Sequence, residues 1–385
     1  MQVAQIKFNA FESISDDDCQ QRIIAAKNKL GKDLVILGHH YQHESVYRHA
    51  DYTGDSLKLS RVVESLDAKY IVFLGVHFMA EVANILSRPD QITILPDLAA
   101  GCSMADMANL SKVERSYREL SKVLSFDEVI TPVTYINSAA DLKAFCGEHG
   151  GIVCTSTNAT KIIEWSFKQR EKVLFFPDQN LGRWSGHKMG IPLDEMPVWD
   201  PDLPLGGLTE AQIKNAKIFL WKGHCAVHQM FRLQNIERFR ETHPHGKVIS
   251  HPECPFEVCA HSDYVGSTEY ILKTITEAPQ GTQWLVGTEL NLVNRLANQM
   301  KSQDKYVQFM SHVICECSTM ARIDPQHLAW CLENIVNDKP VNIIKVPEDE
   351  AKLAKLTLDR MLQVDRKSTR LNSSHTDISR MPSSA

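Results

Sequence analysis

Short apolar runs alternate with amphipathic segments along most of the chain. The apolar runs are rich in β-branched and aromatic residues, and several lack polar alternation, which is typical of parallel strands buried on both faces. They predict strands at 34–38, 70–76, 92–96, 129–136, 151–157, 172–177, 218–223, 247–251, 263–268, 283–288 and 305–311. The segments between them predict helices at 54–66, 77–87, 138–150, 226–243, 267–278 and 289–300. The alternation therefore predicts an α/β fold with parallel sheets that helices cover on both faces.

Three of the predicted strands end in similar polar residues, in the stretches "HHYQ", "YINS" and "HPEC". A hydroxyl follows each after 17 to 21 positions, in the pairs His39 and Ser56, Tyr135 and Ser156, and His251 and Thr268. Ligands of open α/β sheets bind outside the carboxyl ends of the strands, and a helix start suits an anion. Three related βαβ units can thus direct three polar edges at one cavity. Taken singly, each hydroxyl is as readily an ordinary helix N-cap.

Composition narrows the class of protein. Of the 385 residues 43% are hydrophobic and 23% charged, a globular balance, and the length suits about two to four domains. The net charge of −5 and the pI near 6.3 argue against a nucleic-acid partner. The sequence has no apolar run of membrane-spanning length and no signal-peptide pattern at its N-terminus, so we expect a cytoplasmic protein with no membrane partner.

Ten cysteines in a reducing compartment are expected to be free thiols, and most of them buried and inert. Three follow predicted strands in loop-like settings, namely Cys102, Cys225 and Cys317. Their wide spacing does not form the close pairs of a structural zinc site. Three separated thiolates, about one per repeat, can hold three irons of a [4Fe–4S] cluster and leave the fourth open as a Lewis acid.

A set of long motifs makes the chain resemble the quinolinate synthase family. The resemblance runs from about residue 20 to 363 and rests on the ordered stretches "GHHYQ", "GDSLKLS", "LGVHFMAEVANIL", "LPDLAAGCSMADM", "TYINSAADLKAFCGEHGGIVCTSTNA", "LFFPDQNLGRW", "WKGHCAVH", "HPECPF", "VGST" and "CSTMARI". It implies three pseudo-threefold-related α/β/α domains around a central [4Fe–4S] cluster. It also implies a transferase of NAD biosynthesis, which condenses iminoaspartate with dihydroxyacetone phosphate to quinolinate and releases phosphate and two waters. An aspartate oxidase or dehydrogenase would supply the iminoaspartate.

The resemblance implies roles for individual residues. Cys102, Cys225 and Cys317 take the cluster role, and Cys317 is preferred to Cys315 because "STMARI" follows it. Cys146, Cys154, Cys254 and Cys259 are interpreted as non-ligands. The implied substrate-binding residues are His39, Ser56, Tyr135, Ile136, Asn137, Ser156, His251, Pro252, Glu253 and Thr268.

The implied catalytic residues are Glu253, His39, Tyr41, Tyr135 and His228. Glu253 is our choice of main base, and we expect partial burial to raise its pKa towards neutrality. His40 should face away from the site, because alternate residues of a strand point to opposite sides.

We expect the first unit at 20–108, with the C-terminal helices at 318–363 as candidates to complete it, the second at 109–200 and the third at 201–317. Residues 366–385, rich in Ser, Thr and Arg, are expected to be a disordered, non-native tail. Two alternative functions stay open: another iron–sulfur hydro-lyase acting on a small acid, and a non-enzymatic iron–sulfur sensor. Product identification separates the first of these from a quinolinate synthase.

Overall fold

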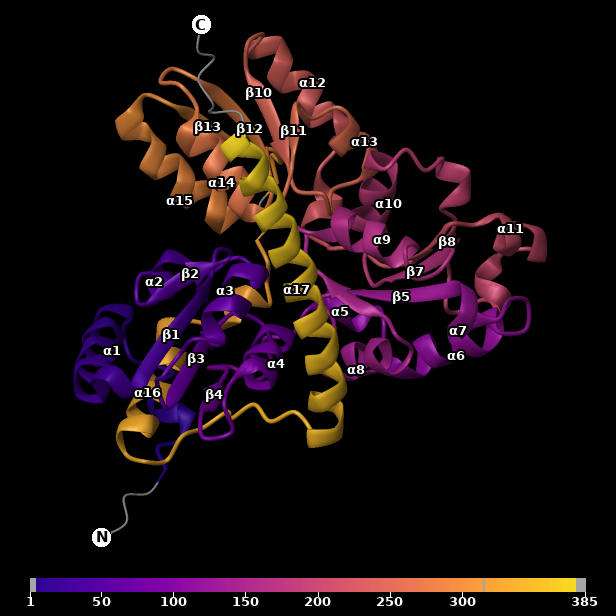
Figure 1. Ribbon diagram of the computed structural model, residues 1–385. Helices are drawn as coiled ribbons and strands as arrows, with labels where there is room; N and C mark the ends of the chain where they lie inside the picture. Colours follow the sequence, from indigo (N-terminus) through magenta and orange to yellow (C-terminus); the bar gives the residue numbers. More distant parts are fainter. Residues whose placement is uncertain (1–4, 314–315, 379–385) are drawn as a thin grey trace, which may run out of the picture.

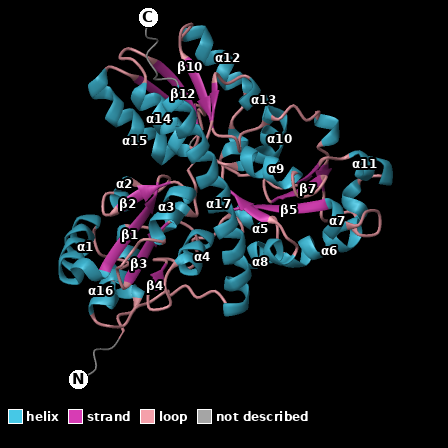
Figure 2. Ribbon diagram, in the orientation of Figure 1, coloured by secondary structure: helices cyan, strands magenta, loops and turns pink. Residues whose placement is uncertain are grey.

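Three parallel sheets form the frame of the molecule (Figures 1 and 2). The computed structural model describes residues 5–313 and 316–378, with side chains described up to residue 366. The strand orders are β2-β1-β3-β4, β6-β5-β7-β9-β8 and β11-β10-β12-β13. The first three strands of each sheet therefore have the same order, 2-1-3. Beside the third strand lies the fourth strand in the first and third sheets, whereas in the second sheet β9 lies there and β8 pairs outside it. Every pairing of these strands is parallel. The predicted α/β class and the threefold repetition are both confirmed.

The first unit holds α1 (Asp16–Leu30), β1 (Leu34–His39), α2 (Glu44–Tyr47), β2 (Tyr52–Gly54), α3 (Ser56–Val63), β3 (Tyr70–Leu74), α4 (His77–Leu86), β4 (Ile92–Ile94) and α5 (Ser103–Asp106). Its short strand β2 and its first helix α1 are not among the elements that the pattern predicts. β2 has only three residues and is partly exposed, and in α1 only Cys19, Ile23 and Ala26 are buried. The hydrophobic pattern of each segment is therefore too weak to predict a strand or a helix there.

The second unit holds α6 (Leu110–Leu120), α7 (Phe126–Val129), β5 (Ile130–Tyr135), α8 (Ala140–Glu148), β6 (Ile152–Cys154), α9 (Ala159–Phe167), β7 (Lys172–Phe176), α10 (Gln179–Lys188), β8 (Val198–Trp199), α11 (Glu210–Asn215) and β9 (Ile218–Trp221). The sequence placed 218–223 in the third unit, whereas β9 pairs with β7 in the second sheet. Alternation along the chain locates a strand but does not say which sheet it joins.

The third unit holds α12 (Leu233–Thr242), β10 (Lys247–Ser250), α13 (Phe256–Ala260), β11 (Tyr264–Val265), α14 (Thr268–Glu277), β12 (Gln283–Gly287), α15 (Leu290–Met300) and β13 (Tyr306–Phe309). The predicted helix at 226–243 is broken: a 3-10 turn, η5 (His228–Met230), is followed by extended backbone at Phe231 before α12 begins. The break places His228 in a loop after β9 instead of on a helix face.

The third sheet has a separate hydrophobic cluster on each of its two faces. Val248 packs with Phe231 and Leu285, while its neighbour Ile249 packs in a separate cluster with Trp284. Adjacent residues of a strand point to opposite faces, so the apolar run of β10 fills two cores at once.

Two helices close the chain. α16 (Pro325–Val336) packs on α1 of the first unit, whereas α17 (Glu348–Ile378) packs mainly on α8 of the second unit and also contacts α4. In Figure 1 α17 is the long yellow helix that crosses the middle of the molecule. The packing thus places α16 beside the first unit and α17 mainly beside the second, and the expected borders of the units stay a prediction.

The last stretch of the chain differs from the expectation of disorder. The backbone of 366–378 continues α17, and residues 379–385 lie outside the described residues. A helix that tertiary packing has already nucleated adds further residues at low cost, even where they bring no apolar periodicity. Among the described residues no helix is both long and apolar enough to cross a bilayer, and the cytoplasmic location stays a prediction.

Candidate functional site

The carboxyl ends of the first strands of the three units meet at one cavity. His39 ends β1, Tyr135 ends β5 and His251 directly follows β10. In all three sheets the second strand lies on one side of the first strand and the third strand on the other. Ligands of such sheets bind at this switch point, between the first and third strands. The space between these strand ends, part of which opens to solvent, measures about 670 Å³. The predicted site residues that line it are His39, Tyr41, Ser56, Cys102, Tyr135, Ile136, Asn137, Ser156, Cys225, His228, His251, Glu253, Thr268 and Cys317.

Pro252 is the one predicted site residue that is not among the lining residues; it is buried between His251 and Glu253. His40 also does not line the cavity, as expected. Its Nε2 lies 2.8 Å from Glu269 Oε1, and its Nδ1 lies 3.0 Å from the Tyr47 hydroxyl. The alternation of β1 thus sends His40 to a structural contact between units.

Two strand-end histidines have the same local arrangement. The backbone N–H of Tyr41 donates to His39 Nδ1 at 3.2 Å, and that of Glu253 donates to His251 Nδ1 at 3.4 Å. In both rings Nδ1 is an acceptor, so a neutral ring carries its proton on Nε2. Burial is the main cause that lowers the pKa of each imidazole to about 3. Both are therefore neutral hydrogen-bond donors at physiological pH.

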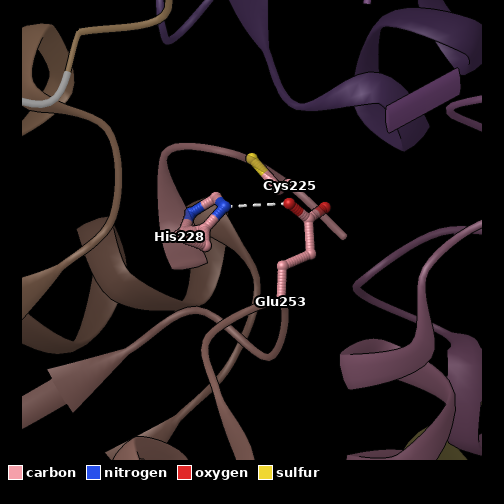
Figure 3. Close-up of side chains that lie close together, drawn as sticks. All are labelled: Cys225, His228 and Glu253. Carbon is pink, nitrogen blue, oxygen red and sulfur yellow. Dashed lines mark ion pairs between the residues drawn. The ribbon is translucent and has the colours of Figure 1, made fainter. Parts of the chain in front are cut away.

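A chain of side chains crosses the floor of the cavity from Tyr135 to Tyr41. The Tyr135 hydroxyl donates to Glu253 Oε1 at 2.6 Å, and Glu253 Oε2 lies 2.9 Å from His228 Nδ1 (Figure 3). His228 Nε2 lies 3.3 Å from Thr288 Oγ1, which lies 2.9 Å from the Tyr41 hydroxyl. The contacts link side chains of all three units; the one between His228 and Glu253 is an ion-pair contact and not a hydrogen bond.

The pKa of Glu253 corrects an expectation. Burial by itself raises the pKa of this carboxyl, but the neighbouring imidazoles of His251 and His228 and the hydrogen bond from Tyr135 outweigh burial and lower it to about 2. The expected rise towards neutrality is wrong, because the sequence does not show that these groups converge on the carboxylate. Burial and the nearby Glu253 raise the pKa of both Tyr41 and Tyr135 well above its usual value.

The three strand-following hydroxyls are not helix caps. Asp55 caps α3 by accepting from Lys58 N–H, and Ser267 caps α14 by accepting from Tyr270 N–H. Ser56 and Thr268 are the first residues inside those helices, and Ser156 lies three residues before α9. All three hydroxyl residues line the cavity instead. The ordinary-cap interpretation is thereby excluded for these positions.

The three candidate cluster cysteines come from different loops, before α5, after β9 and before the 3-10 turn η7 (Met320–Arg322). Burial raises the pKa of the Cys102 thiol to about 12 and also raises those of Cys225 and Cys317. Cys225 and Cys102 each gain a further increase from neighbouring cysteines of the set, which reflects their proximity. Thiolates here would need a positive charge beside them, which a bound metal supplies.

The remaining described cysteines do not line the cavity, and all of them are buried: Cys19, Cys146, Cys154, Cys254, Cys259 and Cys331. Cys315 lies outside the described residues. A second metal-capable group overlaps the site, because ligand atoms of Cys225, His228 and Glu253 lie within 4.8 Å of one another (Figure 3). The donor set fits a thiolate-held cluster, since three thiols from three loops face one cavity.

Some lining residues were not predicted. Asp55 and Glu289 bring carboxyl groups, and Thr155 and Thr319 bring hydroxyls. Thr288, which links His228 to Tyr41, was also missed, although it follows β12 directly. The rule that located His39 and His251, a polar residue at a strand's carboxyl end, could have found Thr288 and Glu289 in "GTE".

Each pair of units shares a side-chain hydrogen bond at the cavity. Tyr41 and Thr288 join the first unit to the third, and Tyr135 and Glu253 join the second to the third. The Thr157 hydroxyl donates to Asp55 Oδ2 at 3.0 Å and so joins the second unit to the first. The cavity therefore exists only when all three units are assembled.

Comparison with known proteins places these features in a family. The family model described as "Quinolinate synthetase A protein" matches residues 21–363. Curated proteins named quinolinate synthase are similar over most of their length. That of Herpetosiphon aurantiacus is 52% identical over 364 residues, covering 94% of this chain and 96% of its own. That of Rhodopirellula baltica is 50% identical over 366 residues, covering 92% and 93%. The resemblance drawn from the motifs is confirmed, and the chain belongs to the quinolinate synthetase A family.

Proposed function

We propose that the chain synthesises quinolinate for NAD biosynthesis, by condensing iminoaspartate with dihydroxyacetone phosphate and releasing phosphate and two waters. Family membership supports the product. The observation that carries the proposal is one cavity that combines three thiols with a chain of proton-handling side chains. An aspartate oxidase or dehydrogenase would supply the unstable imine.

Two carboxylates and a phosphate need partners in this cavity. Among its described lining residues there is no lysine or arginine. The anions would therefore rest on the hydroxyls of Ser56, Ser156 and Thr268 and on the N-termini of α3 and α14. The Nε2–H groups of His39 and His251 would add neutral donors aimed at a substrate carboxylate. Such a site holds charge by hydrogen bonds and dipoles instead of ion pairs.

The proton chemistry follows from the directions of the contacts. An ionised Glu253 favours the His228 tautomer with its proton on Nδ1, which leaves Nε2 as an acceptor. A proton from the Tyr41 hydroxyl can then pass through Thr288 to His228, with Glu253 stabilising the imidazolium as the carboxylate of a catalytic triad does. Tyr135 would serve as a donor to the bound intermediate. A substrate that draws Tyr135 away from Glu253 removes one donor and raises the basicity of that carboxylate.

Cys102, Cys225 and Cys317 would hold a [4Fe–4S] cluster. When bound, such a cluster supplies a Lewis acid to a substrate hydroxyl that leaves as water. Near each of these cysteines in the sequence an apolar residue lines the cavity, namely Met104, Val227 and Met320. These apolar side chains would limit the access of bulk water to the cluster.

The deciding experiment is anaerobic purification and reconstitution, followed by iron and sulfide counts and an assay for quinolinate. We expect about four of each per chain and a charge-transfer band that bleaches on reduction. Cys102→Ser, Cys225→Ser and Cys317→Ser should each lose the cluster, whereas Cys315→Ser and the buried Cys254→Ser should retain it. Bound zinc in place of iron would point to the Cys225, His228 and Glu253 group and would overturn the cluster assignment.

A further inference from the structure

A completely buried lysine lies directly behind one wall of the cavity. Lys143 of α8 has no exposed surface and does not line the cavity. Its Nζ donates to Ile136 O at 3.0 Å, to Ser138 Oγ at 3.3 Å and to Ser138 O. Burying an ammonium group is costly unless hydrogen bonds and a counter-charge compensate for it. Its three acceptors all belong to the turn that follows β5.

That turn carries the candidate site residues Ile136 and Asn137, and Tyr135 ends the strand directly before it. The Ser138 hydroxyl, which Lys143 contacts, donates to Tyr135 O at 2.7 Å. The backbone N–H of Ile136 donates to Cys154 O at 2.8 Å, which fixes the start of the turn to β6. The lysine therefore holds the carbonyls on either side of Asn137, while Tyr135 begins the same turn and donates to Glu253.

Carboxyl groups of two units face Lys143, namely Glu81 of α4 in the first unit and Asp141 of α8 itself. The Lys143 ammonium lowers the pKa of the Glu81 carboxyl, although burial is the larger cause and raises it. Glu81 Oε2 also accepts the Ala140 N–H at 3.1 Å, at the start of α8. The ring of Phe78, which lines the cavity, lies 5.8 Å from Lys143 Nζ. Two walls of the cavity thus meet at this ammonium group.

Two other buried lysines show what a purely structural role looks like. Lys172 donates to the carbonyls of Lys214 and Ala216, at the end of α11. Lys305 donates to the carbonyls of Ile275 and Thr276, at the end of α14. Neither lysine nor its acceptors line the cavity. Lys143 differs because its acceptors lie in a site turn.

We propose that Lys143 is a positioning residue, whose ammonium group holds the 136–138 turn so that Tyr135 and Asn137 face the substrate. The expected effect on quinolinate formation rests on the proposed function, whereas the expected effect on the 136–138 turn does not. Since the proposal assigns no contact between Lys143 and substrate, it concerns geometry and not proton transfer.

The test compares Lys143→Met, which removes every donor, with Lys143→Gln, which keeps two N–H donors, and with Lys305→Met as a control of matched chemistry and burial. Steady-state kinetics of quinolinate formation are normalised to iron content and measured well below each variant's Tm. Hydrogen exchange of the backbone amides at 136–139 is followed by mass spectrometry on the same reconstituted proteins.

We expect Lys143→Met to lower kcat/KM by about 10- to 100-fold, chiefly through a higher KM, with unchanged iron content. Exchange at 136–139 should become at least about tenfold faster. Lys143→Gln should lie between Lys143→Met and the parent protein. Lys305→Met should keep near-parent kcat/KM and speed exchange only near 275–278.

The proposal is overturned if Lys143→Met matches Lys305→Met in kinetics and leaves exchange at 136–139 unchanged. If Lys143→Met does not fold, Lys143→Gln decides by the same two readouts. If the parent protein makes no quinolinate, the proposed function fails by itself, and exchange at 136–139 still supports or removes the positioning role.

Discussion

Glu253 shows how much the surroundings of one side chain decide. The carboxylate is 3% exposed, yet its pKa is lowered and not raised, because Tyr135 and His228 lie against its two oxygens. A buried charge is tolerated where hydrogen bonds satisfy it. Its ionised state is what would keep His228 oriented towards Thr288.

Replacement of this carboxylate tests the relay. Glu253→Gln keeps the shape but loses the charge that orients His228, so we expect quinolinate formation to fall by about 10²–10⁴-fold with normal iron content. The measurement is kcat per cluster. Glu257→Gln, an exposed carboxyl four residues later, is the control. Near-parent turnover in Glu253→Gln would remove this residue from the mechanism.

The buried histidines predict acid sensitivity. His39 and His251 have folded-state pKa values lowered to about 3 from 6.5, so between pH 6.5 and 3 the unfolded chain binds protons that the folded chain does not. Stability therefore falls as pH falls through this window, by up to about 1.4 kcal/mol per pH unit for each ring. The urea midpoint of the cluster-free protein between pH 6.5 and 4 measures the effect.

His39→Asn should flatten that pH dependence, because it removes one ring that must take up a proton on unfolding. His245→Asn, which changes an exposed ring, should leave the slope unchanged. Equal slopes in all three proteins would show that burial of His39 does not set the acid sensitivity.

At the scale of an element, the starts of α3 and α14 separate capping from binding. The cap of α14 is Ser267, and the cavity-lining hydroxyl is the next residue, Thr268. In α3 the corresponding neighbours are Asp55 and Ser56. Two adjacent residues thus do different work because only the first has the extended backbone of an N-cap.

Substitutions at the two neighbouring positions should therefore affect different properties, stability at Ser267 and substrate binding at Thr268. Ser267→Ala should destabilise the protein by about 1 kcal/mol, with little change in the KM for dihydroxyacetone phosphate or iminoaspartate. Thr268→Val keeps the size of the side chain and leaves the Ser267 cap in place, so the urea midpoint should stay close to the parent value. It removes a hydroxyl that lines the cavity, so the KM for at least one of the two proposed substrates should rise. Reversed effects on midpoint and KM would show that Thr268 is the structural residue.

At the scale of the whole molecule, α17 packs across the first two units, and hydrogen bonds across the cavity join all three, whose sheets share the strand order 2-1-3. Ala354, Leu358 and Met361 of α17 are fully buried in a core shared by the first two units. Gly147 of α8 permits the close approach of this helix, because a Cβ there would lie 2.5 Å from Leu353 O. Among the described side chains of α17, buried positions extend to Asp365.

Two changes separate the packed part of α17 from its extension. Truncation after Arg366 keeps the buried positions described up to Asp365 and the contact of Arg366 with Glu64, so we expect the unfolding midpoint and iron uptake to stay close to the parent values. Gly147→Ala should destabilise the protein by about 1–3 kcal/mol, because the backbone of α17 must move. Thermal unfolding measures both, and a strongly destabilised truncation would assign a packing role to the extension.

The sequence by itself determined most of the strands, though not the short β2 and β8, and also the α/β class, the repetition and the residue types at the strand ends. Periodicity and turn residues are local, so every strand that it predicted is present, and His40 faces away from the cavity as alternation requires. The motifs likewise carried the family, which the comparisons confirm.

Only the tertiary structure decided which of those residues meet. Tyr135 and Glu253 are 118 positions apart, and Tyr41 and Thr288 are 247 apart, so no local pattern pairs them. Local patterns also do not show that β9 joins the second sheet or which acceptors surround the ammonium group of Lys143. A pKa and a hydrogen bond depend on distances in space, and these are set only when three sheets and α17 pack around a common cavity.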